Sequence, residues 1–240
     1  MGHKALTISK LRAGYNELDV LLDVNIDILR GEWVLLVGPN GCGKSTFLKV
    51  IGGLLQPRDG QVNVHVFRTK FQKYRNNYIG FLKQTNNIFP ALTVKENLEL
   101  AAFYSEKKEF EEYEEFVFSV FPDIKDNIFK RSGLLSGGMR QKLAIGMALA
   151  KKSDLLLLDE PTAGLAPNAS IEILLKIEKL KKELSQFKEL TIIMVEHNYK
   201  YAVDKVTRLV GMKEGQIVID SQSPKKVLEE KKEMEKIFFG

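Results

Sequence analysis

The chain has little of what would place it outside the ordinary globular proteins. One cysteine, Cys42, is present among 240 residues, so no internal disulfide can form and a reducing compartment is expected. Aliphatic runs do not exceed four residues, whereas a membrane span needs about 20 apolar residues. Residues 1–4 lack the apolar stretch of a signal peptide, and no repeat, proline-rich linker or low-complexity tract occurs. We therefore expect one large soluble domain, or one domain with an inserted lobe.

The charge balance is mildly basic. The 36 lysines and arginines exceed the 31 aspartates and glutamates, which gives a net charge of +5 and a pI near 9.0. This excess of positive charge alone does not indicate whether the protein binds nucleic acid, binds an anionic membrane surface, or has no charged partner. Residues 60–95, which we name the basic window, contain no acidic residue and six basic ones: Arg68, Lys70, Lys73, Arg75, Lys83 and Lys95.

The pattern of apolar residues predicts a parallel sheet covered by helices. Residues 6–11 alternate as in a strand. Three continuous apolar runs have the character of buried strands: residues 34–37, 155–158 and 191–195. Helical periodicity follows the first run at residues 45–55 and separates the other two at residues 171–184. Such alternation of strands with helices is typical of α/β proteins.

The middle of the chain has a different character. Helical patterns with little strand signal fill three stretches: residues 94–104, 110–121 and 138–151. We therefore interpret residues 87–140 as a helical lobe inserted into an α/β core formed by residues 1–86 and 141–240. Short β segments around Gly215 and a charged helix from Pro224 are expected to end the chain.

A glycine-rich loop lies between the first buried run and the first predicted helix. It fits the pattern G-x-x-x-x-G-K-[ST] through Gly38, Pro39, Asn40, Gly41, Cys42, Gly43, Lys44 and Ser45, and Thr46 follows. Glycines let backbone N–H groups converge on phosphate oxygens, and the helix adds the positive end of its dipole. We expect Lys44 to reach the β- and γ-phosphates and the Ser45 hydroxyl to bind Mg²⁺. The alternative, a glycine-rich turn before a helix, is disfavoured by the strand that precedes the loop.

An Asp-Glu pair follows the second buried run. Asp159 closes that run, so its carboxylate is expected at the carboxyl end of a strand, where ligands bind in open α/β sheets. We expect Asp159 to hold Mg²⁺ through water and Glu160 to accept a proton from an attacking water. A solvated turn would explain the pair taken alone, but the phosphate loop upstream favours catalysis. The two motifs together predict an ATPase that uses ATP and Mg²⁺.

A third motif carries a family resemblance. The residues Leu135, Ser136, Gly137, Gly138, Met139, Arg140 and Gln141 resemble the signature motif of ABC-type ATPases, and they precede the Asp-Glu strand as that motif does. The resemblance covers essentially the whole chain. It implies a P-loop NTPase core with a mainly parallel sheet, an N-terminal antiparallel β part and an inserted helical lobe.

The resemblance also implies how the signature motif acts. In this family two ATPase subunits pair head to tail, as a homodimer or a heterodimer, and each ATP lies between one phosphate loop and the partner's signature motif. Ser136 and Gly138 would contact the γ-phosphate of the partner's ATP, and Gly137 and Gln141 belong to the same nucleotide-binding stretch.

Three further residues match family positions. Gln84 matches the glutamine that senses Mg²⁺ and contacts the membrane partner, so it is expected among the catalytic and metal-binding residues. His197 matches the histidine that contacts the γ-phosphate. Tyr15 resembles the aromatic residue that stacks on adenine, and a packing role would explain it equally well.

One loop departs from the commonest family pattern. Many members carry an aspartate in the loop after the catalytic glutamate, where this sequence has Ala166, so the resemblance does not extend to communication between subunits through that carboxylate. The order Gly164, Leu165, Ala166, Pro167 instead resembles the ATPases of branched-chain amino acid importers. Residues 84–98 and 238–240 resemble them too.

The function implied by this resemblance is the ATP-hydrolysing subunit of an amino-acid importer, bound peripherally at the cytoplasmic face of the cell membrane. Its partners would be a second ABC ATPase, transmembrane permease subunits and an extracytoplasmic substrate-binding protein. An exporter subunit is one alternative. A soluble ABC ATPase of DNA repair or iron–sulfur assembly is another, but zinc cysteines and a long coiled-coil insertion are absent, and no nucleic acid partner is expected.

Two features lead to separate hypotheses. Cys42 lies in the phosphate loop near a helix N-terminus, which should favour its thiolate. We therefore expect a thiol reagent to inactivate the protein and MgATP to protect it, unless Cys42 is only a small filler residue. The basic window would lie near anionic lipid head groups or acidic loops of the membrane partner, or else form a solvated face.

Overall fold

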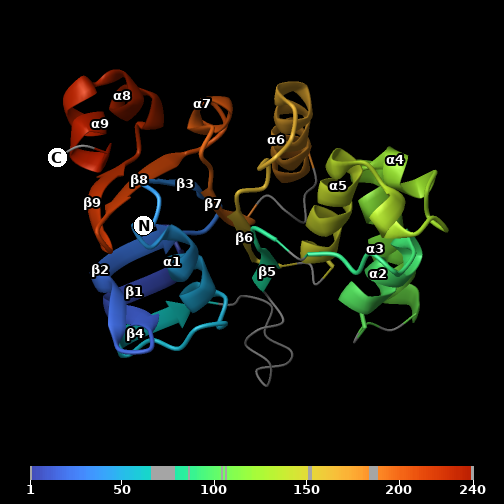
Figure 1. Cartoon of the computed structure of the whole chain (residues 1–240), viewed down its shortest axis with the longest axis horizontal. Coiled ribbons are helices and arrows are strands. Elements are labelled where there is room, and N and C mark those ends of the chain that lie inside the picture. The colour runs from blue at the N-terminus through green and yellow to red at the C-terminus, as the bar shows by residue number, and fades with distance from the viewer. Residues whose placement is uncertain are drawn as a thin grey trace.

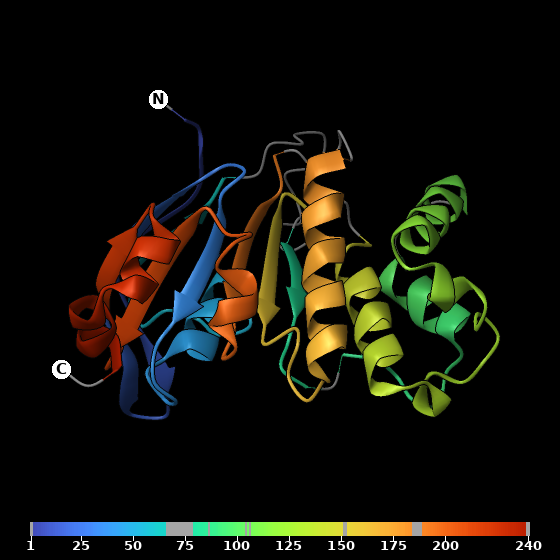
Figure 2. The same ribbon diagram turned by 90° about the horizontal axis from the view of Figure 1, so that it is seen from above.

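The molecule contains two β-sheets towards one end and a separate group of helices at the other. Figure 1 shows the sheets towards one end and the helices between residues 94 and 148 at the other, and Figure 2 shows the same division from above. The computed structural model describes residues 2–65, 79–85, 87–103, 105, 107–150, 153–183 and 189–238.

A three-stranded antiparallel sheet is formed near the N-terminus, as the family resemblance implied. Its strand order is β2 (Leu18–Leu29), β1 (Lys4–Tyr15) and β4 (Asp59–Val64). The sequence pattern located only the centre of β1. In β2, Val24, Ile26 and Ile28 do alternate with polar residues, but Asp23 adopts a left-handed φ of 53° beside irregular pairing, which divides the alternating pattern in two.

A six-stranded sheet forms the centre of the molecule. From edge to edge its strands are β5 (Ile79–Leu82), β6 (Leu155–Asp159), β7 (Thr191–Val195), β3 (Trp33–Val37), β8 (Arg208–Lys213) and β9 (Gln216–Ser221). The first five strands are parallel, and β9 is antiparallel to β8. The three buried runs predicted from the sequence are confirmed as β3, β6 and β7.

Helices cover both faces of this sheet. Helix α1 (Lys44–Ile51) packs on one face together with the three-stranded sheet. The opposite face carries α6 (Pro167–Glu183), α7 (Tyr199–Ala202), α8 (Pro224–Glu229) and α9 (Lys231–Phe238). In the described part of the chain, none of the helices combines the length and the apolar character that crossing a bilayer requires.

Burial on two sides explains the continuous apolar strands. In β6, Leu156 and Leu158 face the core that contains α6, whereas Leu155 and Leu157 face the core that contains Phe47 of α1. Burying one such side chain contributes about 1.5–3 kcal/mol. A charged residue in the middle of these strands would therefore be costly, and charged groups are confined to the strand ends.

The remaining helices lie together at the far end of the molecule (Figure 2). They are α2 (Val94–Ala101), α3 (Lys107–Val120), α4 (Pro122–Lys125), the 3-10 helix η2 (Ser132–Leu134) and α5 (Gly137–Ala148). Thr93 and Glu96 form a capping box at the start of α2, each side chain accepting from the other residue's N–H. The boundary that we proposed at residue 140 falls inside α5.

Several predicted helix ends differ from the observed ones. The helix predicted for residues 45–55 ends at Ile51, because Gly52 caps it and Gly53 follows with a left-handed φ of 70°. The helices predicted to reach residues 104 and 151 end at Ala101 and Ala148.

The basic window is described only in part. Its residues Arg68, Lys70, Lys73 and Arg75 lie outside the described residues. Lys83 is exposed, and Lys95 Nζ lies 4.0 Å from Glu99 Oε1. The hypothesis about this window stays a prediction.

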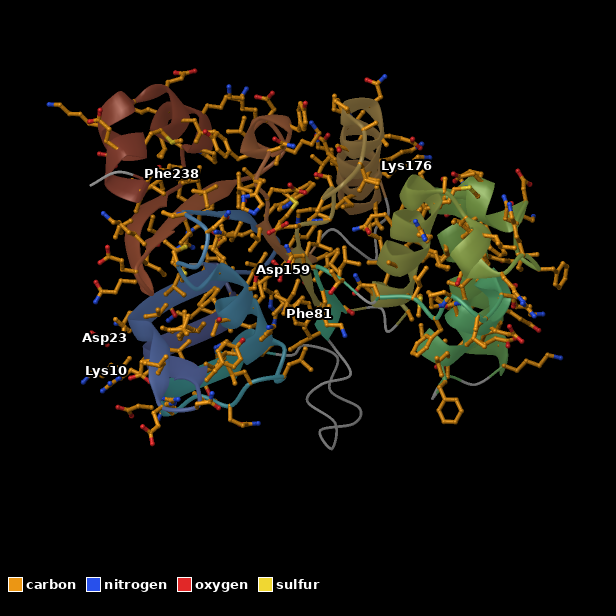
Figure 3. All side chains as sticks on the ribbon, in the orientation of Figure 1. Lys10, Asp23, Phe81, Asp159, Lys176 and Phe238 are labelled. Carbon is orange, nitrogen blue, oxygen red and sulfur yellow. The ribbon has the colours of Figure 1, made fainter. Side chains whose placement is uncertain are left out.

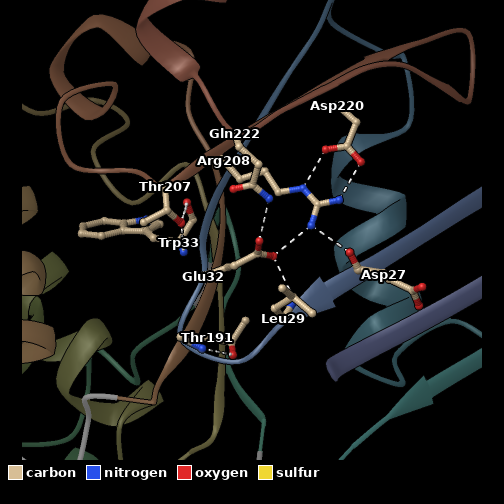
Figure 4. Close-up of polar contacts among 10 residues, drawn as sticks. Asp27, Leu29, Glu32, Trp33, Thr191, Thr207, Arg208, Asp220 and Gln222 are labelled. Carbon is tan, nitrogen blue, oxygen red and sulfur yellow. Dashed lines mark hydrogen bonds and ion pairs between the residues drawn. The ribbon is translucent and has the colours of Figure 1, made fainter. Parts of the chain in front are cut away.

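A partly buried ion-pair network ties the two sheets together (Figure 4). Arg208 of β8 donates through Nη1 to Glu32 Oε2 at 2.9 Å and to the Asp27 carbonyl at 2.8 Å. Its Nε and Nη2 donate to the two carboxylate oxygens of Asp220, each at 2.6 Å. Glu32 also accepts from Gln222 Nε2 at 2.9 Å. Because Asp27 belongs to β2 and Asp220 to β9, Arg208 links the three-stranded sheet to the edge of the six-stranded one.

Replacing Glu32 by alanine should destabilise the fold, because Arg208 would keep only one carboxylate partner in a buried setting. We expect Glu32→Ala to lower the free energy of unfolding by about 3 kcal/mol, measured by urea denaturation. Lys4→Ala is the control, since it removes an exposed pair with Asp27 and should change stability little. A loss for Glu32→Ala no larger than that of the control would contradict a stabilising role for the network.

Candidate active site

The glycine-rich loop joins β3 to α1 and requires glycine at two positions in particular. Gly38 has a φ of 154°, and a Cβ there would lie 2.1 Å from the Met212 carbonyl oxygen. Gly43 has a φ of 107° and is the N-cap of α1, a helix that no side chain of the described residues caps. The first amide groups of α1 are therefore available to an anion.

The Lys44 ammonium lies within this loop. Its Nζ donates to the carbonyl oxygens of Gly38 and Pro39 at 2.8 and 2.7 Å, and the residue is buried. The loop thus combines the positive charge of the Lys44 ammonium with N–H groups at the start of a helix, and both groups attract phosphate oxygens.

Asp159 lies at the carboxyl end of β6, near the middle of the molecule (Figure 3). Its Oδ1 accepts from the Ser45 hydroxyl at 3.1 Å, and burial raises the pKa of its carboxyl group while the Ser45 hydrogen bond opposes the rise. A nearby cation would stabilise the charged form. The Ser45 hydroxyl and the Asp159 carboxylate are oxygen ligands of the kind that Mg²⁺ takes together with substrate phosphates, so these two residues fit that ion. Within the described residues, no group of three or more His, Cys, Asp or Glu could hold a metal.

Glu160 turns out of the strand direction immediately after Asp159. It has a left-handed φ of 55°, and its N–H donates to the Val195 carbonyl at 3.0 Å. Gln84 Nε2 donates to its Oε2 at 3.0 Å, and His197 Nε2 lies 2.9 Å from its Oε1. The structure thus brings together the three residues predicted to be catalytic, from the loops after β5, β6 and β7.

Gln84, Glu160 and His197 line one open cavity of about 310 Å³ together with the phosphate loop, and Asp159 is not among its described lining residues. Its described lining residues are Val20, Asn40, Gly41, Gly43, Lys44, Ser45, Thr46, Gln84, Glu160 and His197. The sequence pattern did not indicate Val20 as a lining residue, because it did not predict strand β2, to which Val20 belongs. Tyr15 is not among the described lining residues. The residue is 42% exposed, and its hydroxyl accepts from Lys49 Nζ at 3.2 Å.

The signature motif lies at a second cavity, of about 390 Å³. Ser136 caps α5, its Oγ accepting from the Met139 N–H at 3.3 Å. The cavity is lined in part by Ser136, Gly137, Gly138, Gly164, Leu165 and Ala166, and none of its described lining residues comes from the phosphate loop. Gln141 is half-buried and is not among these described residues. One chain therefore does not bring its signature motif to its own phosphate loop.

A lysine that no sequence motif indicated holds the helix that begins in the signature motif. Lys142 of α5 donates from Nζ to Asp123 of α4 at 2.8 Å and lies 2.7 Å from Glu172 of α6. Its side chain is only 11% exposed. These contacts fix the N-terminal half of α5 against α6, and the spacing of the three residues in the sequence gives no sign of them.

The prediction that the Cys42 thiolate is favoured was wrong. Cys42 is 6% exposed, and burial raises the pKa of its thiol, while Lys44 opposes the rise less strongly. Lys44 Nζ lies 3.8 Å from the sulfur but is bound by the two loop carbonyls. Desolvation of the thiol therefore outweighs the stabilisation of the thiolate by Lys44.

Comparison with known proteins places these motifs in a family. The model of the family described as ABC transporter matches residues 21–163 of this chain. The "Probable branched-chain amino acid transport ATP-binding protein LivF" of Archaeoglobus fulgidus is 41% identical over 81% of this chain and 82% of that protein. The "High-affinity branched-chain amino acid transport ATP-binding protein BraG" of Pseudomonas aeruginosa is 34% identical over 89% of this chain and 91% of that protein.

Solved structures agree with this placement. A nucleotide-free ATP-binding cassette from an ABC transporter superposes with a TM-score of 0.82 at 25% identity, over 97% of this chain and 98% of that one. A dimeric ATP-binding cassette in a post-hydrolysis state with ADP and Pi gives a TM-score of 0.77 at 26% identity, over 90% of this chain and 98% of that one. From the family match, the relatives and these folds, the chain belongs to the ABC transporter family, as one of its ATP-hydrolysing cassettes.

Proposed function

We propose that this cassette powers a membrane transporter and that Glu160 is the base of its hydrolytic reaction. The observation that carries the proposal is the position of the Glu160 carboxylate, between Gln84 and His197 at the mouth of the phosphate loop. A carboxylate at this place can accept a proton from the water that attacks the γ-phosphate of ATP. Phosphate oxygens would meet the loop amides and Lys44.

Ser45, Asp159 and Gln84 would hold Mg²⁺, which when bound offsets the negative charge of the β- and γ-phosphates. The Ser45–Asp159 hydrogen bond already places a hydroxyl and a carboxylate, both oxygen ligands suited to this ion, beside the phosphate loop. His197, which lines the same cavity, would contact the γ-phosphate. Tyr15 would contribute its exposed ring to adenine.

Head-to-tail pairing of two cassettes is supported by the glycines of the signature motif. Neither Gly137 nor Gly138 is among the described residues with a positive φ. A Cβ on Gly138 would meet no atom of the described residues within 4 Å, and one on Gly137 would make only an ordinary contact with Leu165. The chain's own packing therefore does not require glycine there, which is expected if the phosphates of a partner's ATP approach this backbone closely.

The transported substrate is proposed from the relatives. The two relatives described above are named for branched-chain amino acids, whereas others at 33% identity are named for acidic amino acids and their amides or for aliphatic sulfonates. We propose an importer of amino acids of branched-chain type. The cassette would then bind transmembrane permease subunits at the cytoplasmic face of the cell membrane, in a system with an extracytoplasmic substrate-binding protein.

Purification of the tagged chain from detergent-solubilised membranes tests the transport assignment. We expect permease proteins with several membrane spans to co-purify, and we expect branched-chain amino acids with their binding protein to raise ATP hydrolysis by the reconstituted complex. Co-purification of a soluble assembly scaffold or of DNA instead would contradict a role in transport.

Glu160→Gln should slow ATP hydrolysis by about 10²- to 10⁴-fold, the range for loss of a general base, because the amide cannot accept the proton. ATP binding should persist, so the variant should accumulate as an ATP-bound dimer in size-exclusion chromatography. Glu178→Gln is the control, since Glu178 lies on α6 and pairs with Lys182. Turnover of Glu160→Gln at the rate of the control would mean that Glu160 is not the base.

Alkylation of Cys42 should be slow at neutral pH and faster as the pH rises. Burial raises the pKa of the thiol, so the reactive thiolate is scarce at neutral pH and increases as the pH approaches that pKa. MgATP should slow labelling further, because nucleotide would cover the loop. Cys42→Ser is the control: it removes the chain's single cysteine and should take up no label. A labelling rate that does not change with pH, or that MgATP leaves unaltered, would contradict this account.

A further inference from the structure

A second buried carboxylate lies at the same edge of the sheet, outside the set of residues discussed above. Glu196 follows β7 and is 5% exposed. Its Oε1 accepts from the N–H of Thr162 at 2.9 Å and from the Thr162 hydroxyl at 2.7 Å. Thr162 itself is 4% exposed, so both groups of this interaction are shielded from water.

The two partners belong to the two loops that carry the proposed catalytic pair. Thr162 comes two residues after Glu160, and Glu196 comes immediately before His197. The loops are joined at three points: by the backbone bond from Glu160 to Val195, by the Glu196–Thr162 bonds, and by the contact between His197 and Glu160. Of the two side-chain contacts, the one between Glu196 and Thr162 is the more deeply buried.

Glu160 needs such support. Its left-handed φ of 55° is a sparsely populated conformation for a residue with a side chain, and it persists only when the surroundings enforce it. After Thr162, the backbone hydrogen bonds described for this loop are local ones, from Ala163 N to Glu160 O at 3.1 Å and from Leu165 N to Thr162 O at 3.2 Å.

Burying Glu196 is costly, which argues that the contact serves more than packing. Burial raises the pKa of the Glu196 carboxyl, and the two hydrogen bonds from Thr162 oppose that rise. The buried N–H of Thr162 requires an acceptor, and Glu196 supplies it across 34 residues of sequence.

We propose that Glu196 is a positioning residue for ATP hydrolysis: by holding Thr162, it keeps the Glu160 carboxylate between Gln84 and His197. This inference rests on the proposed role of Glu160 as the base. Through Leu165 and Ala166, the same loop continues to the cavity of the signature motif, so Glu196 also ties the base to the surface proposed to meet the second cassette.

The first test compares Glu196→Ala with Glu196→Gln by ATP hydrolysis and by the equilibrium affinity for ATP. Glu196→Ala should lower kcat by about 10- to 100-fold, since small displacements of a catalytic group have effects of this size, and should leave the affinity nearly unchanged. Glu196→Gln keeps an oxygen that can accept both bonds from Thr162, so it should retain most of the parent kcat.

The second test uses the other partner. Thr162→Val removes the hydroxyl donor and should lower kcat, whereas Thr162→Ser keeps the hydroxyl and is the matched control. Because Thr162 and Glu196 act through one contact, the losses of Thr162→Val and Glu196→Ala should not add in the double variant. Thermal unfolding is measured for each variant, and if Glu196→Ala does not fold, Thr162→Val, Thr162→Ser and Glu196→Gln decide the question.

Three results would overturn the inference: an unchanged kcat in Glu196→Ala and Thr162→Val, a loss in Glu196→Gln as large as in Glu196→Ala, or a fall in ATP affinity equal to the fall in kcat. The Glu160→Gln variant separates this inference from the proposed function. If Glu160→Gln is slow while Glu196→Ala is not, only the role of Glu196 fails. If Glu160→Gln turns over normally, the base assignment fails and the inference fails with it.

Discussion

The parallel register of β3, β6 and β7 is the constraint on which the site depends. β6 lies beside β7 with Asp159 opposite Val195, and β3 lies on the other side of β7 with Leu36 opposite the same residue. Since the three strands run in one direction, the segments that follow them leave the sheet at one edge and bring the phosphate loop, Glu160 and His197 together. The register is fixed in turn by burial of both faces, because a shift of one residue would move every strand side chain to the opposite core.

That edge is also where charged groups can enter an otherwise apolar interior. Lys44, Asp159 and Glu196 are each less than a tenth exposed, and each is held by specific hydrogen bonds. Burial raises the pKa of both carboxyl groups, so their charged forms gain from a nearby cation or donor. The same environment that makes these charges expensive makes a matching ligand favourable, and the site is therefore electrostatically suited to a phosphate with its metal ion.

The phosphate loop and the signature motif of the chain lie at separate cavities. The phosphate loop lies at the sheet edge, and the signature motif lies at the start of α5, where Lys142 holds that helix to α6. Under the proposed function each motif completes the site of a second cassette. Within one chain, the segment from Thr162 to Ala166 connects the two regions: it follows the proposed base, Glu160, and reaches the signature cavity. Glu196 contacts the first residue of this segment, Thr162.

The sequence by itself determined the parts whose signal is local. The continuous apolar runs predicted β3, β6 and β7, and the spacing of Gly38, Gly43 and Lys44 predicted the phosphate loop, because backbone sterics and burial act over a few residues. It did not predict β2, whose alternation is broken at Asp23, nor the raised pKa of Cys42, which depends on how neighbouring segments exclude water. Only the tertiary structure decided that Glu196 meets Thr162, that Lys142 meets Glu172, and that the signature motif lies away from its own phosphate loop. These contacts and positions involve residues far apart in the chain. Their energies depend on desolvation and on distances in space, which a local sequence pattern does not predict.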